Sequence, residues 1–324
     1  MVIDPNHFAF YNLFLMSVSL FESKDLPLSL WKKILDRAHS IKNNTFKPDP
    51  KLTSKSVGML FFEPSSRTRW SFEKACLDLK IPSMVSIVDG STSKSKGETQ
   101  IDSLDLYLEL GFDLVVVRVG SDQEVLKKLR EANLKTSFIN AGFGGGYHPT
   151  QALLDYFTWT NDTSANVSKI LIMGDVAHSR VAKSHLRFSK IMSYQVGLLP
   201  APGLELGEKD CEELKPDVVF TDRAEALKWA EVVMSLRTQK ERHSEETKFT
   251  TFEALSSKEL SSDHIIMHPG PFIRGEDLEE DLIKDSRSLI FKQKRNGVHC
   301  RAALISCLLE ENNKNKNKNK KDGL

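Results

Sequence analysis

The strongest constraint on the fold is the alternation of short apolar runs with helical segments along most of the chain. Four apolar runs in the first half predict buried strands, and helical periodicity fills the gaps between them. The runs are SVGMLFF (56–62), PSMVSIV (82–88), DLVVVRV (113–119) and TSFIN (136–140). Strands that alternate with helices at this spacing are typical of βαβ units and therefore of parallel sheets.

The second half of the chain repeats the pattern and ends in an amphipathic helix over 296–311. A helix over 148–159, with Pro149 in its first turn, separates the two halves. We therefore expect an α/β protein with two parallel-sheet domains joined by this bridging helix. The strands expected in the second half are 169–175, 217–222, 230–236 and 264–270.

Charge and composition exclude several classes of protein. The chain has 45 basic and 44 acidic residues, which argues against a nucleic-acid partner bound through bulk charge. Residues 312–324 (NNKNKNKNKKDGL) carry a net charge of +4, so the rest of the chain is mildly acidic. We expect this Lys/Asn tail to be disordered because of its low complexity.

Two further features concern the compartment. The four cysteines show no CxxC spacing and are expected to be reduced packing residues in a cytoplasmic protein. The apolar segment 8–21 has no Lys or Arg before it and is too short to span a bilayer. We expect this segment to dock on the folded body, and we expect no membrane association.

The first chemically informative group follows the strand 56–62, at an end of a parallel sheet where ligands bind. Ser65, Ser66, Arg67, Thr68 and Arg69 lie where a helix begins. The first N–H groups of a helix lack intrahelical partners and lie at the positive end of its dipole, so this group predicts a phosphate site. The alternative is an ordinary N-cap serine beside a surface arginine.

Other groups in the first half are weaker signals. Arg118 lies in the run VVVRV, where an unpaired buried guanidinium is costly, so we expect an anionic ligand or an internal salt bridge. The loop 91–98, which contains Lys96, reads by itself as a solvated connector. His148 follows a glycine-rich loop at a helix start, with Gln151 one turn later; it is either a hydrogen-bond donor to a carbonyl or a cap.

Arginines also follow strands in the second half. Arg180 follows 169–175, and Arg237 and Gln239 follow 230–236. Guanidinium groups in these positions suit a dicarboxylate, although the run RTQKER also fits an exposed charged turn. The turn His268-Pro269-Gly270-Pro271 either presents backbone carbonyl oxygens to a ligand or has only a structural role. We find no metal-ligand cluster in the sequence and expect neither a metal nor a cofactor.

Taken together, these segments resemble the aspartate/ornithine carbamoyltransferase family over about residues 15–310. The motifs FFEPSSRTRWSFE, KGET, HPTQALLD, GDVAHSR, RTQKER and MHPGPFIRG occur in the family's order. The resemblance implies a carbamoyl phosphate-binding domain at 1–150 with 296–311, whose C-terminal helix packs back on it, and an aspartate-binding domain at 151–295. It also implies a homotrimer with active sites at subunit interfaces.

The resemblance assigns a role to each candidate residue. Carbamoyl phosphate is expected to contact Ser65, Ser66, Arg67, Thr68, Arg118, His148, Gln151 and the carbonyls of Gly270 and Pro271. Within this set, the catalytic residues are expected to be Arg67, Thr68, Arg118 and His148. The amino-acid substrate is expected to contact Arg180, Arg237, Gln239 and a Lys96 donated by a neighbouring subunit.

The resemblance favours L-aspartate over ornithine. Ornithine members carry His-Cys-Leu-Pro where this chain has His268-Pro269-Gly270-Pro271, and Arg237 with Gln239 suits a second carboxylate. The expected reaction is carbamoyl transfer to aspartate in pyrimidine synthesis. The alternatives are transfer to ornithine or an acylated ornithine, and a non-catalytic homologous subunit.

Some points stay open at this level. Regulatory or dihydroorotase-like subunits are possible partners in such a family. Ser66 replaces the usual Thr, and Phe143 stands where Asp is common. The sequence does not decide which of Ser91, Thr92 and Ser93 assists the neighbouring site.

Overall fold

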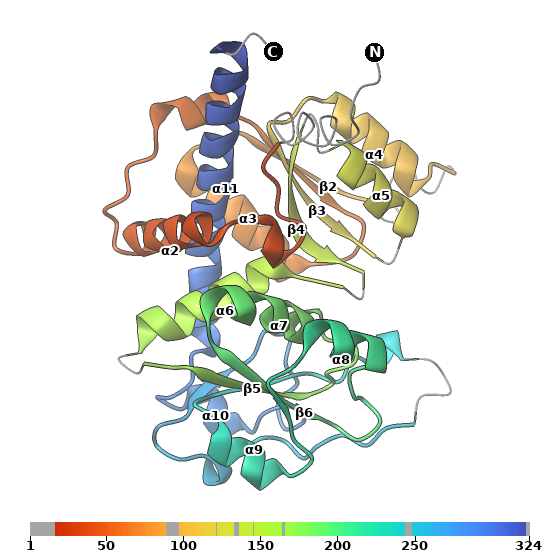
Figure 1. The fold of residues 1–324 in the computed structure, drawn as a ribbon, viewed down its shortest axis with the longest axis vertical. Coiled ribbons are helices and arrows are strands. Elements are labelled where there is room, and N and C mark those ends of the chain that lie inside the picture. Colours follow the sequence, from red (N-terminus) through yellow and green to blue (C-terminus); the bar gives the residue numbers. More distant parts are fainter. Residues whose placement is uncertain are drawn as a thin grey trace, which may run out of the picture. The chain divides into compact units, whose positions relative to one another are not determined.

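The chain divides into two compact units in the computed structural model (Figure 1). Unit 1 comprises Met1–Gly144 and Val298–Leu324, and unit 2 comprises Gly145–Gly297. The expected divisions were after residues 150 and 295, so helix-start residue His148 belongs to unit 2. The structure describes residues 17–88, 97–120, 122–132, 136–144, 146–163, 166–243 and 248–321.

Unit 1 contains a four-stranded parallel sheet. Its order is β2-β1-β3-β4, and each of the four strands expected in this half of the chain is present. Every residue of β1 and β4 is buried, whereas β2 lies at an edge and begins with exposed residues. The strands are β1 (Val57–Phe61), β2 (Ser83–Ile87), β3 (Leu114–Val119) and β4 (Ser137–Phe143).

Helices accompany the strands of unit 1. The amphipathic α2 was not expected from the sequence, and it buries Leu30, Trp31, Ile34 and Ala38 along one face. The helix α4 starts with a reciprocal capping box between Thr99 and Asp102. The helices are α2 (Leu28–Lys42), α3 (Ser66–Leu79), α4 (Gln100–Glu109) and α5 (Gln123–Ala132), with 3-10 turns at Ser23–Asp25 and Pro50–Ser54.

The described end of the N-terminal apolar segment docks on β4. The backbone N–H of Leu20 donates to the carbonyl of Phe138 at 2.8 Å, and the N–H of Asn140 donates to the carbonyl of Leu20 at 2.8 Å. Leu20 is fully buried. These bonds extend the sheet ladder by one bridge, as expected of a docked segment, while residues 8–16 lie outside the described part of the chain.

Unit 2 contains a five-stranded parallel sheet with the order β7-β6-β5-β8-β9. The strand order reverses between β5 and β8, which makes their carboxyl ends the expected binding crevice of this sheet. The sequence reading missed β6. The strands are β5 (Lys169–Gly174), β6 (Gln195–Pro200), β7 (Val218–Val219), β8 (Val232–Ser235) and β9 (Ile265–Met267).

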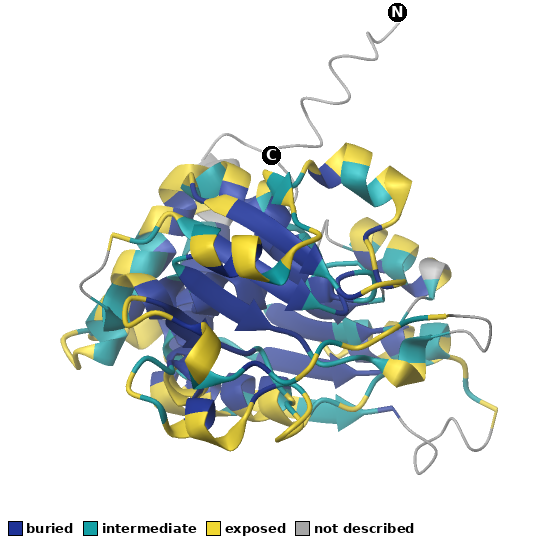
Figure 2. Cartoon of the chain, turned by 90° about the horizontal axis from the view of Figure 1, so that it is seen from below, coloured by how far each residue is buried: buried dark blue, intermediate teal, exposed yellow. Residues whose placement is uncertain are grey.

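The strands of both sheets are largely buried, and exposed residues gather on the outer helices and loops (Figure 2). In unit 2 the helix α6 is itself almost entirely buried. Its Trp159 packs on Tyr156 of the same helix and on Tyr194. The helices of unit 2 are α6 (Pro149–Asp162), α7 (Arg180–Met192), α8 (Glu208–Leu214), α9 (Arg223–Trp229) and α10 (Glu280–Lys284), with 3-10 turns at Lys240–Arg242 and Ser257–Glu259.

The last helix, α11 (Ile290–Lys321), begins in unit 2 and continues through the end of unit 1. It packs on unit 1 as expected, since Arg37 donates to both carboxylate oxygens of Glu310 at 2.7 and 2.8 Å. The prediction of a disordered tail is wrong for 312–321. A helix that is already nucleated extends at little cost, and the Asn312 side chain accepts from the Val18 N–H at 2.7 Å.

The cysteines behave as packing residues in the structure. Cys76, Cys300 and Cys307 are buried, Cys211 is partly buried, and all four are free thiols. Burial raises the pKa of Cys76 to about 12 and that of Cys307 to about 11, so both remain thiols at neutral pH.

No helix among the described residues is both long enough and apolar enough to cross a membrane.

Candidate active site

The start of α3 has the properties of an anion site. Ser65 occupies the N-cap position, yet among the described residues its side chain makes no capping hydrogen bond. The 14-residue helix therefore presents its first-turn N–H groups without the usual side-chain cap. Ser66 and Arg67 are exposed, and Thr68 is only 8% exposed. The segment thus combines a positive helix end, three hydroxyls and a guanidinium.

Arg118 lies at the same end of the unit 1 sheet. In the parallel pairing of β1 with β3, Arg118 stands opposite Phe61, the last residue of the strand that leads to α3. Its Nη1 donates to the Ala141 carbonyl at 3.1 Å, and its Nε lies 3.5 Å from Glu63 Oε2. The internal salt bridge that the sequence left as an alternative is therefore present, beside the candidate phosphate residues. Lys96, Ser91, Thr92 and Ser93 lie outside the described residues.

His148 and Gln151 lie at the start of α6 in unit 2. His148 is the N-cap residue and is 7% exposed; its N–H donates to Ser184 Oγ at 2.7 Å, and its Nδ1 lies 3.3 Å from Thr150 Oγ1. The Nε2 amide of Gln151 donates to Asp155 Oδ1 at 2.9 Å. The two side chains that the resemblance assigns to the carbamoyl group are thus held by hydrogen bonds at one helix start.

The sequence reading missed the group that holds Gln151. Asp155 is fully buried, and its Oδ1 also accepts from Gln293 Nε2 at 2.7 Å, while its Oδ2 lies 3.2 Å from His185 Nε2. The spacing of Gln151 and Asp155, four residues apart on a helix, was available in the sequence. Gln293 and His185 gave no comparable signal, because only the fold brings them there.

Arg180 is the first residue of α7 and follows β5 after a short loop. It is 8% exposed. The side chain of the N-cap residue Ser179 accepts from the Ala182 N–H at 3.1 Å, so α7 has the conventional cap that α3 lacks.

Arg237 and Gln239 follow β8, the neighbour of β5 in the sheet. Arg237 forms an ion pair with Glu241, with Nη1 3.0 Å from Oε2. Hydrogen bonding to Glu241 raises the pKa of Arg237, and the same contact lowers the pKa of Glu241. The Gln239 N–H donates to Asp175 Oδ2 at 2.9 Å, and its side chain donates to the His178 carbonyl at 3.0 Å. These bonds join the ends of β5 and β8.

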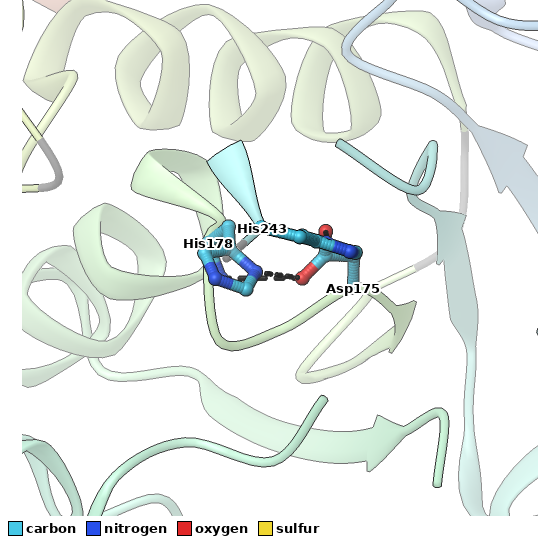
Figure 3. A group of neighbouring side chains, drawn as sticks. All are labelled: Asp175, His178 and His243. Carbon is cyan, nitrogen blue, oxygen red and sulfur yellow. Dashed lines mark hydrogen bonds and ion pairs between the residues drawn. The ribbon is translucent and has the colours of Figure 1, made fainter. Parts of the chain in front are cut away.

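Asp175 is the centre of a second buried network (Figure 3). His178 Nδ1 lies 2.8 Å from one carboxylate oxygen and His243 Nε2 lies 2.9 Å from the other. Burial raises the pKa of Asp175, but the hydrogen bonds from His243, the Gln239 N–H and His178 outweigh it and leave the pKa below its usual value. One donor atom from each residue lies within 4.8 Å of the others, a spacing compatible with metal ligands, although both imidazoles already pair with the carboxylate.

The turn after β9 contains the two backbone carbonyls predicted to contact substrate. The peptide bond between Gly270 and Pro271 is cis, and Gly270 adopts a φ of 68°, in the region that favours glycine. The Gly270 N–H donates to His268 Nδ1 at 2.9 Å, and the His268 N–H donates to Gln293 Oε1 at 3.0 Å. The turn is therefore tied to Gln293 and, through it, to Asp155.

The structure thus gathers the predicted residues in two groups. In unit 1, Arg118 and the segment from Ser65 to Thr68 lie at one end of the sheet. In unit 2, the candidates lie at the start of α6, after β5, after β8 and after β9. Each group contains arginine beside hydrogen-bonding groups at the carboxyl ends of parallel strands, which is where this class of α/β protein binds anionic ligands.

Comparison with known proteins identifies the class. The chain belongs to the aspartate/ornithine carbamoyltransferase family: the model of the family's carbamoyl-P binding domain matches residues 19–161, and the model of its Asp/Orn binding domain matches residues 166–308. The first of these models extends over α6, which the contacts within the chain assign to unit 2.

Particular relatives narrow this further. The aspartate carbamoyltransferase catalytic subunit of Acetivibrio thermocellus is 37% identical over 308 residues, which cover 91% of this chain and 97% of that protein. The catalytic subunit of M. jannaschii aspartate transcarbamoylase matches with a TM-score of 0.75 and 26% identity, over 91% of this chain and 99% of that one.

A third similarity concerns the fold. Aspartate transcarbamoylase from Trypanosoma cruzi, solved in complex with carbamoyl phosphate and aspartate, matches with a TM-score of 0.78. The match covers 90% of this chain and 97% of that chain at 24% identity. The fold, with two parallel-sheet α/β units, is therefore that of aspartate transcarbamoylases.

Proposed function

We propose that this protein transfers the carbamoyl group of carbamoyl phosphate to the amine of L-aspartate, giving N-carbamoyl-L-aspartate and phosphate. The observation that carries the proposal is the placement of three arginines after strand ends in a member of this family: Arg67 and Arg180 in the first turns of the helices that follow β1 and β5, and Arg237 in the loop after β8. Guanidinium forks bind phosphate and carboxylate in bidentate geometry, so these three positions suit two anionic substrates.

The phosphate of carbamoyl phosphate is assigned to unit 1. Arg67 supplies charge, and Thr68 and the first-turn N–H groups after Ser65 supply hydrogen bonds at the positive end of α3. Ser66, the departure from the family's usual Thr, keeps a hydroxyl at its position. Arg118, at the neighbouring strand end, is assigned to both the phosphate and the carbamoyl oxygen.

The carboxylates of aspartate are assigned to Arg180, Arg237 and Gln239. The ion pair with Glu241 restricts the rotamers of Arg237 and keeps its guanidinium in one place. A cationic ornithine side chain would meet like charge at Arg237, which supports aspartate as the acceptor. The carbonyls of Gly270 and Pro271 and the side chain of Gln151 are assigned to the carbamoyl NH₂ group.

The proposed chemistry is acyl transfer. The neutral amine of aspartate attacks the carbamoyl carbon, the bond from that carbon to the phosphate oxygen breaks, and the proton lost by the amine leaves on phosphate. Negative charge grows on the carbamoyl oxygen, where hydrogen bonds from Arg118, Thr68 and His148 stabilise it as an oxyanion hole does. Holding both reactants in one geometry lowers the entropic part of the barrier.

The assembly and setting are part of the same proposal. We propose a cytoplasmic homotrimer that acts in pyrimidine synthesis and in which Lys96 contributes to the site of a neighbouring subunit. Light scattering coupled to size-exclusion chromatography gives the mass of the purified protein. A mass of three chains supports this assembly, whereas a monomer that is fully active contradicts it.

The activity is tested by supplying carbamoyl phosphate with either aspartate or ornithine and separating the carbamoylated amino acids. We expect N-carbamoylaspartate with aspartate and no citrulline with ornithine. Citrulline as the main product would assign the chain to the ornithine branch. Absence of both products from folded protein would favour the non-catalytic subunit.

A further inference from the structure

Asp155 is a buried ionisable group to which the proposed mechanism gives no role. Its side chain is completely inaccessible to solvent, in the second turn of α6. A carboxylate in such a place is costly unless hydrogen bonds satisfy it. Three nitrogen atoms do so, and they come from Gln151, Gln293 and His185.

The contacts of Asp155 fix the orientation of two glutamine side chains. The amide nitrogens of Gln151 and Gln293 meet the same oxygen, Oδ1, at 2.9 and 2.7 Å. An amide nitrogen only donates and an ionised carboxylate only accepts, so rotating either amide by 180° would place oxygen against oxygen. The carbonyl oxygen of each glutamine side chain therefore remains the end that accepts from another group.

The second oxygen of Asp155 is held as well. His185 Nε2 lies 3.2 Å from Oδ2, and His185 Nδ1 lies 2.8 Å from the hydroxyl of Tyr194. The Tyr194 hydroxyl also lies 3.3 Å from the His185 carbonyl oxygen, to which it donates. An ionised carboxylate only accepts, so the contact with Oδ2 calls for an N–H on His185 Nε2.

Both glutamine side-chain oxygens are linked to the proposed binding of the carbamoyl NH₂ group. Gln293 Oε1 accepts from the His268 N–H, which begins the turn that contains Gly270 and Pro271. Gln151 Oε1 is the acceptor end of a side chain assigned to the carbamoyl group. One buried carboxylate oxygen thus orients a side-chain acceptor directly and a pair of backbone acceptors through one intermediate residue.

We propose that Asp155 is a positioning residue that sets specificity. By orienting Gln151 and Gln293, it leaves only hydrogen-bond acceptors facing the carbamoyl NH₂ group. The site therefore takes an acyl phosphate bearing NH₂ in preference to one bearing a methyl group. The inference rests on the proposed function and deepens it. It assigns the choice of acyl donor to a residue that does not touch the substrate.

The readout is the ratio of kcat/KM for carbamoyl phosphate to kcat/KM for acetyl phosphate, each with saturating aspartate. Acetyl phosphate carries CH₃ in place of NH₂ and gives N-acetylaspartate and phosphate by the same bond changes. An oriented acceptor favours only the carbamoyl donor, whereas general damage to the fold slows both reactions. The ratio therefore separates positioning from stability.

The main variant is Asp155→Leu, which keeps the approximate volume and removes both acceptor oxygens. We expect the ratio to fall by about 10- to 100-fold, because a group left without its buried hydrogen-bond partner discriminates poorly. Gln151→Leu is expected to lower the ratio less, because Asp155 still holds Gln293 and the turn that follows β9. The double variant is expected to match Asp155→Leu. A wild-type ratio in folded Asp155→Leu overturns the inference.

Asn296→Leu is the matched control. Asn296 links α11 to α6 one turn from Gln293, through Thr158 Oγ1 at 3.1 Å and Asp162 Oδ2 at 2.6 Å, without contact to Asp155. We expect it to cost stability and to leave the ratio unchanged. An equal fall of the ratio in this control would show that the loss is structural and would overturn the inference.

Gln151→Glu decides the matter if Asp155→Leu does not fold. Two carboxyl groups would then face each other and share a proton, which raises one of their pKa values. We expect kcat/KM for carbamoyl phosphate to show an added deprotonation, with activity lost at higher pH. A pH profile that matches the wild type overturns the inference, and wild-type protein that forms no carbamoylaspartate overturns the proposed function itself.

Discussion

The two units present their candidate residues in opposite ways. At the start of α3 in unit 1, Ser66 and Arg67 are exposed, and the N-cap residue Ser65 makes no side-chain cap among the described residues. At the start of α7 in unit 2, Arg180 is 8% exposed and Ser179 caps the helix. The start of α3 leaves its first-turn N–H groups without a side-chain cap, whereas Ser179 caps the start of α7.

Under the proposed function, this difference suits two different kinds of anion. A helix start with its first-turn N–H groups uncapped binds phosphate through backbone dipoles and charge, and needs little side-chain organisation. A dicarboxylate acceptor and a planar carbamoyl group require groups in defined directions. Two of the unit 2 candidates, Gln151 and Gln239, accordingly bond to the buried carboxylates of Asp155 and Asp175.

The largest expected effect is on Arg67. Arg67→Ala should lower kcat/KM by about 10³-fold, since it removes a charged donor to the phosphate. Arg69→Ala is the matched control, because Arg69 lies two residues away and its Nε is 3.7 Å from Glu73 Oε1. Initial rates should be near wild type in the control. Full activity in Arg67→Ala would remove the phosphate site from unit 1.

A smaller loss is expected at Arg237. Arg237→Met should raise the KM for aspartate by about 10²-fold, because one carboxylate loses its bidentate partner while other contacts remain. Arg223→Met, which breaks the ion pair with Glu259 in the same unit, should leave that KM unchanged. If both variants behave alike, the position of Arg237 after β8 has no special significance.

The caps should differ in what they contribute to stability. Ser179→Ala should lower the free energy of unfolding by about 1 kcal/mol, the usual cost of losing an N-cap hydrogen bond. Ser65→Ala should change it by less than about 0.5 kcal/mol, because no cap is lost at α3. Urea unfolding of the two variants measures the difference. Equal losses would contradict the contrast between the two helix starts.

The smallest effect concerns acid stability. Hydrogen bonds hold the pKa of Asp175 below its ordinary 3.8, so its contribution to stability is complete above that pH and is lost as the pH falls through the lower folded value. Asp175→Asn should therefore weaken the pH dependence of the urea unfolding midpoint between about pH 5 and pH 2. Asp102→Asn, at an exposed capping box in unit 1, should flatten it less. A larger effect at Asp102 would contradict the account.

The sequence was a good guide to the strands, because runs such as VVVRV combine β-branched residues with burial on both faces. It missed β6, whose short run QVGLLP is interrupted by glycine and ends in proline. For the tail, composition favours disorder, whereas the contact of Asn312 with the Val18 N–H depends on the fold.

The candidate residues that follow strands were predictable from the sequence. The residues that support them through buried hydrogen bonds were not. Arg67, Arg180 and Arg237 could be found because they follow apolar runs. Gln293 lies 138 residues from Asp155 in the sequence, and their contact depends on the packing of α6 with α11. Such supporting residues have no local motif, so only the fold reveals them.

The most direct test of the account is equilibrium binding of a single molecule that carries a phosphonate at one end and an aspartate-like dicarboxylate at the other. Isothermal titration calorimetry with wild type, Arg67→Ala and Arg237→Met compares the two anion sites on that one ligand. The account predicts tight binding by the wild type and a large loss in each variant. Binding that is unaffected by either substitution would contradict the claim that both units serve one reaction.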